Sequence, residues 1–128
     1  MKIAKLVGTV FSGGGEGKRF LDLPWVKRQV KQQLGFIPYS GTLNVMLSEE
    51  SAKRRKVLEN ASSLRFCPPE GYCNGALFKA LIGTLKCAVV IPEVVGYPKD
   101  ILEIIAAINL RERFQLENGN EVTVIVIL

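Results

Sequence analysis

The stretch NGNEVTVIVIL, residues 118–128, is the clearest indication of the fold. Asn118-Gly119 is a strong hairpin-turn dipeptide, and Glu121 to Leu128 is rich in β-branched residues, which favour strands. Ile101 to Ala106 is ambiguous between strand and helix because a short apolar run lacks a decisive period, but its isoleucines favour a strand. Five other short strands are predicted, at Ile3 to Phe11, Leu43 to Leu47, Leu64 to Phe66, Ala76 to Ala80 and Leu85 to Ile91.

Fewer segments have a helical pattern. One helix is predicted to begin at Pro24, a favourable first helical residue, and to end at Gly35. A short helix is predicted after Asn109, whose side chain can cap it, and another over Ser48 to Leu58. These elements do not alternate as in a doubly wound α/β sheet, so we predict a mostly β fold with short helices. A closed, mostly antiparallel barrel with helical insertions, forming a single domain over residues 1–128, fits best.

Composition sets limits on the partners. The chain carries a net charge of +5, which favours anionic ligands without choosing among them. Its densest basic cluster, Lys53 to Lys56, is expected to be a solvated helix face or loop. No apolar run reaches the roughly 18 residues of a membrane span, and the N-terminus lacks the apolar core of a signal peptide. We therefore expect a cytoplasmic protein with no membrane partner, and a monomer is favoured.

Cysteine and histidine usage limits the chemistry. The three cysteines, Cys67, Cys73 and Cys87, are an odd number without a C-x-x-C pair, so no disulfide framework is expected and a reduced intracellular setting fits best. The absence of histidine excludes Ser-His-Asp and Cys-His catalysis and every histidine-ligated metal site. Any metal should be a hard cation held by oxygen, with Mg²⁺ the leading candidate.

The most suggestive functional stretch is Ser12-Gly13-Gly14-Gly15-Glu16-Gly17-Lys18-Arg19, directly after the first predicted strand. Successive glycines allow a close backbone approach to a ligand, and their free N–H groups can bind an anion. The stretch is not a Walker A loop, because Arg19 stands where Ser or Thr is required. It is not a Rossmann turn either, because the glycine spacing differs and no helical pattern follows directly. A phosphate cradle and a flexible connector are both open on local sequence.

Three more segments carry polar groups at suggestive places. Thr42 and Asn44 lie two residues apart at the start of a strand, where both side chains share one face and can hold Mg²⁺ or satisfy the turn backbone. Asn109 to Glu112 opens a helix, so it can bind phosphate or a base edge, or be an ordinary cap. Glu103 lies among apolar residues and is either exposed at a sheet edge or turned into a pocket. The aromatic residues that can stack a planar ligand are Trp25, Phe36, Tyr39 and Tyr97.

Taken in order, these segments resemble the archaeal CTP-dependent riboflavin kinase family. The resemblance runs nearly end to end and is weakest over about Ser48 to Tyr72. It rests on five motifs in the same order, Gly13 to Gly17, Leu34 to Asn44, Val90 to Pro92, Leu102 to Ala106 and Leu110 to Phe114. The family implies a closed six-stranded, cradle-loop β-barrel that phosphorylates riboflavin to FMN, with CTP as phosphate donor, CDP as product and Mg²⁺ as cofactor.

The resemblance also implies roles for particular residues. Thr42 and Asn44 would bind Mg²⁺, and Glu103 would contact the flavin. Val95 stands where the family has a flavin-contacting threonine, so that hydroxyl contact is absent or supplied differently. The nucleotide would be held by Gly13, Gly14, Gly15, Glu16, Gly17 and Lys18 at its phosphates and by Ile108, Asn109, Leu110 and Arg111 at the cytidine.

Phosphoryl transfer needs positioning, charge neutralisation and a metal more than covalent chemistry, which agrees with a histidine-free site. We expect Lys18 or Arg19 to stabilise the transferring phosphate and Glu103 to orient or deprotonate the riboflavin 5′-hydroxyl. Two alternatives are a non-catalytic barrel that binds DNA through its basic surface and a flavin or nucleotide binder without activity. The kinase interpretation predicts no nucleic-acid partner.

Overall fold

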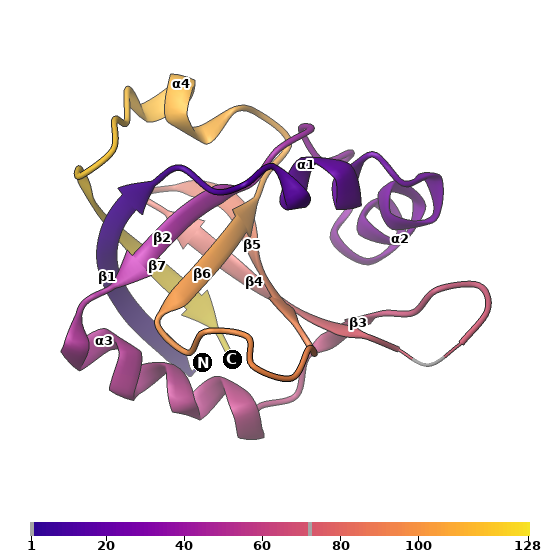
Figure 1. Ribbon diagram of the computed structural model, residues 1–128, viewed down its shortest axis with the longest axis horizontal. Helices are drawn as coiled ribbons and strands as arrows, with labels where there is room; N and C mark the ends of the chain where they lie inside the picture. Colours follow the sequence, from indigo (N-terminus) through magenta and orange to yellow (C-terminus); the bar gives the residue numbers. More distant parts are fainter. Residues whose placement is uncertain (1, 72) are drawn as a thin grey trace.

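The computed structural model describes residues 2–71 and 73–128. Seven strands, four α-helices and one 3₁₀ helix follow one another in these residues (Figure 1). In chain order they are β1 (Ile3–Phe11), α1 (Glu16–Leu21), α2 (Pro24–Leu34), β2 (Leu43–Leu47), α3 (Glu49–Arg54), η1 (Arg55–Asn60), β3 (Leu64–Phe66), β4 (Gly75–Ile82), β5 (Leu85–Pro92), β6 (Ile101–Ile105), α4 (Leu110–Phe114) and β7 (Glu121–Ile127).

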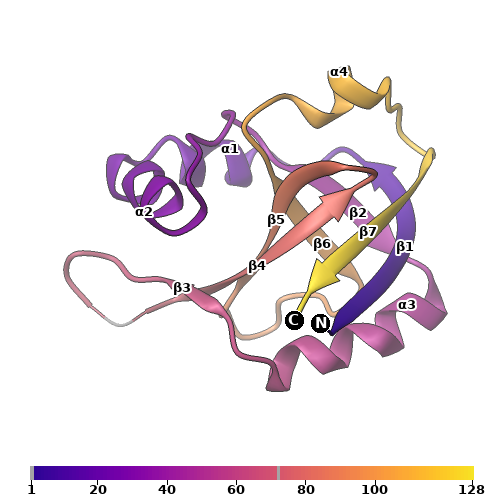
Figure 2. The same ribbon diagram turned by 180° about the vertical axis from the view of Figure 1, so that it is seen from behind.

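The strands form one antiparallel sheet that closes on itself. Their order is β3-β4-β5-β6-β2-β1-β7, and a further pairing of β4 with β7 joins the two sides into a six-stranded barrel. β3 lies outside the closed ring and extends β4 as a hairpin that projects from the barrel in both views (Figures 1 and 2). The predicted mostly β fold with a closed six-stranded barrel and helical insertions is confirmed.

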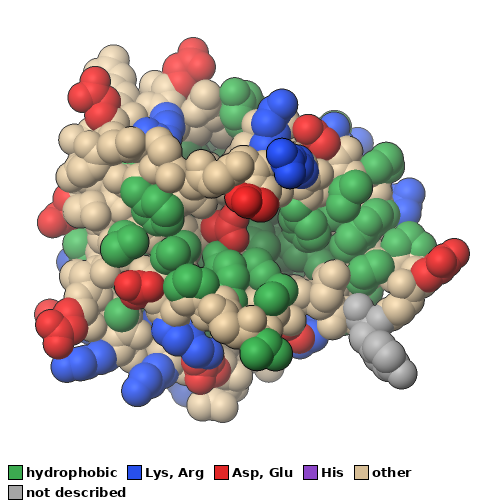
Figure 3. All heavy atoms as spheres, viewed as in Figure 1, with side chains coloured by type: hydrophobic (Ala, Val, Ile, Leu, Met, Phe, Trp, Pro, Cys, Tyr) green, Lys and Arg blue, Asp and Glu red, His purple; other side chains and the backbone are tan. Residues whose placement is uncertain are grey.

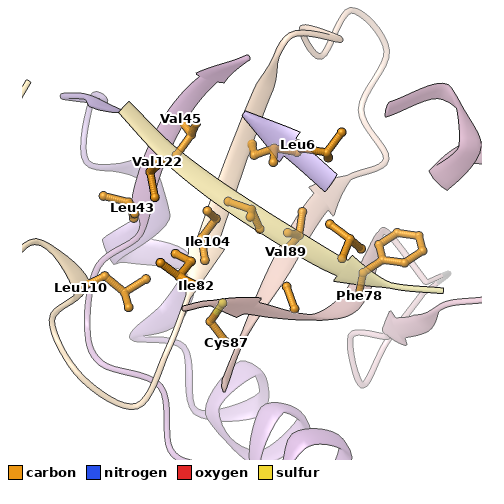
Figure 4. Close-up of a cluster of buried hydrophobic side chains, with 14 of the residues drawn as sticks. Leu6, Leu43, Val45, Phe78, Ile82, Cys87, Val89, Ile104, Leu110 and Val122 are labelled. Atoms are coloured by element: carbon orange, nitrogen blue, oxygen red, sulfur yellow. The ribbon is translucent and has the colours of Figure 1, made fainter. Parts of the chain in front are cut away.

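Apolar side chains fill the barrel. Alternate residues of each strand point inward, and Leu6, Val45, Val89 and Ile104 are all fully buried (Figure 4). β1 and β2 come very close at Gly8, where a Cβ atom would overlap the carbonyl oxygen of Met46. Gly8 therefore allows the tight approach that curves the sheet into a barrel.

A second apolar cluster covers the outside of the sheet at β3, β4 and β5. α1 and α2 supply its Leu21, Val26 and Val30, and the sheet supplies Phe66 and Val90 among others. α2 has the predicted bounds and ends at Gly35, which has a φ of 82°. This packing places the end of the glycine-rich loop against the outer face of the barrel.

α1 is the helix that the sequence did not indicate, and the expectation that no helix follows the glycine stretch was wrong. Gly15, with a φ of 88°, turns the chain directly into the helix. Its six residues include Gly17 and are too few to display a period. Buried Leu21 and half-buried Phe20 hold it against the second apolar cluster, so tertiary packing rather than propensity stabilises it.

α3 and η1 close the opposite end of the barrel from α1 and α4 (Figure 1). Ser48 caps α3 as predicted, accepting a hydrogen bond from the Ser51 backbone N–H. Within the basic cluster Lys53 to Lys56, however, Arg55 is only 3% exposed, so the expectation of a fully solvated cluster was wrong. η1 packs along the barrel and turns Arg55 inward, while Arg54 stays exposed and pairs with Glu50.

Cys67 and Cys73 form a disulfide, contrary to the expectation from the cysteine count. The β3–β4 hairpin pairs Phe66 with Gly75, which brings the two ends of the intervening loop together. Cys87 is buried and free, and burial raises the pKa of its thiol to about 12. Spacing in the sequence did not indicate the bond because the hairpin register creates it.

No helix within residues 2–71 and 73–128 is long and apolar enough to cross a membrane.

The disulfide can be tested by thiol counting. Denatured, unreduced protein should show a single reactive thiol, that of Cys87, and reduction should expose all three. The Cys73→Ser variant should lose about 2 kcal/mol of unfolding free energy, because the unfolded chain is no longer cross-linked. Reductant should destabilise the natural sequence but leave this variant unchanged. Three reactive thiols without reduction would contradict the bond.

Candidate functional site

The glycine-rich loop forms one wall of a cavity at the rim of the barrel, of about 250 Å³. Ser12 to Lys18 line it on one side, and Thr42, Asn44, Glu103 and Arg111 line it on the other. We call it the glycine-loop cavity. Residues predicted from four separate segments of the chain therefore meet in one place. Figure 3 shows a hollow on this face with acidic side chains at its edge and hydrophobic ones beside it.

Two glycines allow the loop to lie directly on the strand residues. A Cβ atom at position 13 would overlap the Asn44 side-chain amide. A Cβ atom at position 17 would lie 2.5 Å from Thr42 Oγ1 and 3.2 Å from Glu103 Oε1. The contact with Thr42 Oγ1 is shorter than real Cβ atoms show and the contact with Glu103 is tight, so a larger residue at either glycine would have to displace the neighbouring side chains.

Thr42 and Asn44 are oriented as the strand geometry predicts. Thr42 immediately precedes β2 and Asn44 lies within it, and Thr42 Oγ1 donates a hydrogen bond of 3.3 Å to Asn44 Oδ1. The β2–β6 register places Asn44 directly opposite Glu103. The predicted metal pair and the predicted carboxylate thus share one face of two neighbouring strands.

The donor chemistry of this pair fits a magnesium ion. Among the described residues, no three His, Cys, Asp or Glu side chains gather at a metal site. Thr42 Oγ1 and Asn44 Oδ1 are neutral hard oxygens beside the glycine-rich loop. Mg²⁺ is commonly held by few protein oxygens, with phosphate and water completing its coordination shell. Thr42 and Asn44 are the residues that would hold it.

Glu103 is half-buried and has a defined partner. The Tyr97 hydroxyl donates a hydrogen bond of 2.6 Å to Glu103 Oε2. Burial is the main cause of a raised pKa for Tyr97, and the hydrogen bond to Glu103 and its negative charge raise it further. Tyr97 was predicted only as an aromatic surface for stacking, so the role of its hydroxyl is a finding of the structure.

Arg111 ties the cavity wall together. Its guanidinium donates to the Phe11 carbonyl oxygen at 3.0 Å and to Asn118 Oδ1 at 2.8 Å. Ser12 and Asn118 also exchange side-chain hydrogen bonds. The start of the glycine loop, α4 and the turn before β7 are therefore fixed to one another.

A second cavity of about 180 Å³ adjoins the first and shares Thr42 and Arg111 with it. The predicted nucleotide residues Ile108, Asn109 and Leu110 line it, together with Tyr39. Asn109 caps α4 as predicted, because its Oδ1 accepts from the Glu112 N–H, and its Nδ2 donates to the Tyr39 hydroxyl at 3.2 Å.

A third cavity of about 250 Å³ lies on the other side of the first and shares Gly17 and Glu103 with it. Its lining is mostly apolar and includes Phe20, Phe66 and Val94. The rings of Phe20 and Phe66 also pack edge to face with each other and with the ring of Trp25. Sequence reasoning named Trp25 but missed the two phenylalanines, since Phe20 lies on α1 and Phe66 on the short hairpin strand.

The three cavities are not lined by Arg19, by Val95 or by three of the predicted stacking residues, Trp25, Phe36 and Tyr97. Arg19 is exposed on α1, and the described residues that line the glycine-loop cavity include Lys18 but not Arg19. Val95 is fully exposed and lines a wider groove beside η1 instead of the cavities that contain Glu103.

The structure is a closed six-stranded β-barrel with three adjoining cavities at one rim, which together form the candidate ligand site. The family model of the CTP-dependent riboflavin kinases, described as a domain of unknown function, DUF120, matches residues 10–126. The chain belongs to this family.

Curated relatives are riboflavin kinases of archaea. That of Methanosarcina barkeri is 37% identical over 97% of this chain and 57% of its own length. That of Pyrobaculum aerophilum is 35% identical over 97% of this chain and 61% of its own length. That of Ignicoccus hospitalis is 36% identical over 98% of this chain and 72% of its own length. The chain thus spans only part of each relative, little more than half in the first.

The close approach of the loop generates a prediction. Gly17→Ala should weaken CTP binding by about tenfold or more, because the methyl group would push the loop off Thr42 and Glu103. Isothermal titration with CTP and Mg²⁺ measures it. Ser62→Thr is the control, since it adds a methyl group at an exposed position outside the three cavities, and it should bind CTP as the natural sequence does. Equal losses in both variants would contradict the assignment.

Proposed function

We propose that this protein transfers the γ-phosphate of CTP to the 5′-hydroxyl of riboflavin, giving FMN and CDP, with the assistance of Mg²⁺. The observation that carries the proposal is the meeting of three cavities at Gly17, Thr42 and Glu103. The first cavity is lined by the glycine-rich loop, the second opens at the N-terminal cap of α4, and the third is mostly apolar. A phosphate chain, a nucleoside and a flat apolar ring are the three parts that a flavin kinase must hold together.

The donor nucleotide occupies the first two cavities in this proposal. Gly13 to Gly17 cradle the phosphates through backbone N–H groups, and Lys18, at the cavity wall, neutralises charge on the transferring group. Ile108 to Arg111 contact the cytidine in the second cavity. Both side chains are exposed, but Arg19 has a smaller part than Lys18 because it lies outside the cavity lining.

Thr42 and Asn44 hold the Mg²⁺ ion at the junction of the first two cavities. When bound, such an ion would neutralise negative charge on the phosphates during transfer. The two side chains contribute by their placement, because the strand fixes both oxygens on one face beside the loop.

Riboflavin occupies the third cavity, with its isoalloxazine ring against Phe20, Phe66 and Val94. Its 5′-hydroxyl then reaches Glu103, which orients it and accepts its proton as the new P–O bond forms and the bond to the β-phosphate breaks. Val95 has no hydroxyl to offer the flavin, so any contact of its side chain is apolar. The enzyme acts as a cytoplasmic monomer without nucleic acid in this proposal.

The direct test incubates the protein with riboflavin, Mg²⁺ and either CTP or ATP and follows FMN by chromatography. FMN should form with CTP and much less with ATP. No FMN with either nucleotide from folded protein would defeat the kinase proposal. Retained riboflavin or CTP binding would then favour a non-catalytic binder, and steeply salt-dependent DNA binding would favour a regulator.

The metal assignment predicts the effect of removing both oxygens. Thr42→Val combined with Asn44→Leu should abolish Mg²⁺-dependent FMN formation while the circular dichroism spectrum and the melting temperature stay close to those of the natural sequence. The exposed Thr84, in the turn between β4 and β5, supplies a matched control as Thr84→Val. An unchanged rate in the double variant would rule out the assignment.

The Glu103→Gln variant distinguishes a proton-accepting role of Glu103 from a purely orienting one. Glutamine keeps the shape and one hydrogen-bond acceptor but cannot take a proton. If Glu103 is the base, kcat should fall by about 10² or more while the KM values for CTP and riboflavin change little. Near-normal turnover would show that the residue only orients the hydroxyl.

A further inference from the structure

The two carboxylate oxygens of Glu103 have different surroundings. Oε2 accepts the 2.6 Å hydrogen bond from the Tyr97 hydroxyl. Oε1 lies toward the glycine loop, 3.2 Å from the place of a Cβ at Gly17, and Thr42 Oγ1 lies 2.5 Å from the same place. One oxygen is therefore held by the protein, and the other faces the cavity where the three ligand parts meet.

We propose that Tyr97 is a positioning residue for phosphoryl transfer: its hydroxyl holds Glu103 Oε2 and so aims Oε1 at the hydroxyl that is phosphorylated. This inference rests on the proposed function, in which Glu103 orients the hydroxyl that is phosphorylated. It adds a residue that makes no contact with the transferring phosphate and acts only through Glu103.

The physical need for such a contact follows from the carboxylate itself. The last torsion of a glutamate side chain is soft and broad, so β6 alone does not fix the plane of the carboxyl group. A hydrogen bond to a charged acceptor is short and strong, and one such bond is enough to fix that plane. Since phosphoryl transfer depends mainly on alignment, a loosely held carboxylate orients the acceptor hydroxyl poorly.

Tyr97 is itself held in a way that suits a permanent donor. It is half-buried, its backbone N–H donates to the Val94 carbonyl oxygen at 3.1 Å, and burial beside Glu103 raises the pKa of its phenol. The phenol therefore keeps its proton at physiological pH and donates it to the carboxylate. The charged groups that face it are the carboxylate of Glu103 and the guanidinium of Arg55.

The segment that carries Tyr97 is tethered to η1. Lys99 pairs with Glu59 at 2.9 Å, and buried Arg55 interacts through its charge with Tyr97, Glu59 and Asp100. Arg55 Nε has no hydrogen-bond partner in the part of the chain that the structure describes. The Tyr97 hydroxyl is thus placed by the connection between β5 and β6 and by η1 rather than by the ligand cavities.

The test is a double-mutant cycle on turnover with Tyr97→Phe and Glu103→Ala. In the natural background, Tyr97→Phe should lower kcat by about tenfold or more and leave the KM for CTP within about twofold, because alignment is lost and nucleotide contacts are kept. In the Glu103→Ala background, the same change should alter kcat by less than about twofold, since no carboxylate remains to be aimed. Full kcat in Tyr97→Phe, or equal losses in both backgrounds, would overturn the proposal.

Lys99→Met is the matched control for general loosening of the segment. It removes the exposed pair with Glu59 but leaves the Tyr97 hydroxyl, so kcat should stay within about twofold of that of the natural sequence. If Lys99→Met lowers kcat as much as Tyr97→Phe does, loop order rather than the hydroxyl is responsible, and the proposal fails.

The same four proteins of the cycle are also compared by urea unfolding, which needs no turnover. Tyr97→Phe should lower the unfolding midpoint in the natural background and lower it less, or not at all, in Glu103→Ala. Additive changes would disprove the hydroxyl–carboxylate bond on which the proposal depends. If the natural sequence forms no FMN but the unfolding cycle is non-additive, the kinase proposal fails while the orientation of Glu103 by Tyr97 stands.

Discussion

The short pairing between β4 and β7 is the constraint on which the rest of the structure depends. Two residue pairs, Ala80 with Val126 and Leu81 with Ile125, join β4 to β7 and so close the strand order β4-β5-β6-β2-β1-β7 into a ring. Closure removes the exposed edges of both strands and leaves an interior that side chains must fill completely. That interior is apolar, with Leu6, Val89 and their neighbours buried (Figure 4). Ligand-binding groups are consequently confined to the outside and the rims.

Nearly all of the candidate ligand-binding groups lie at one rim of the barrel because its strands are antiparallel. β1 ends where β2 begins, with Phe11 opposite Asn44, and β6 ends beside the same place, with Ile104 opposite Leu43. The glycine loop, Thr42 and the connection to α4 therefore emerge together, although they lie far apart in the sequence. The opposite end is closed by α3 and η1 (Figure 1). Antiparallel closure thus explains why segments predicted separately from the sequence form one site.

The sequence predicted what depends on local pattern and missed what depends on register. The strands, α2 with its Gly35 end, and the Asn109 and Ser48 caps follow from periodicity and cap chemistry, and they were found. The Cys67–Cys73 bond depends on the hairpin register, and the inward turn of Arg55 depends on how η1 packs. The Tyr97 contact with Glu103 depends on a loop conformation that no pattern encodes. The resemblance grouped most of the other residues that line the three cavities, because family motifs carry such tertiary information.

The distribution of charge at the rim constrains the order of events in the proposed reaction. The oxygens assigned to Mg²⁺ are neutral, and Arg111 already donates to Phe11 and Asn118. A hard divalent cation gains most from anionic oxygens, and the cavity lining offers it the carboxylates of Glu16 and Glu103, one oxygen of the latter being engaged by Tyr97. In the proposed reaction, the nucleotide phosphates would supply most of the negative charge that the metal needs. We therefore expect metal and nucleotide to bind together, which would leave the second oxygen of Glu103 for the acceptor hydroxyl.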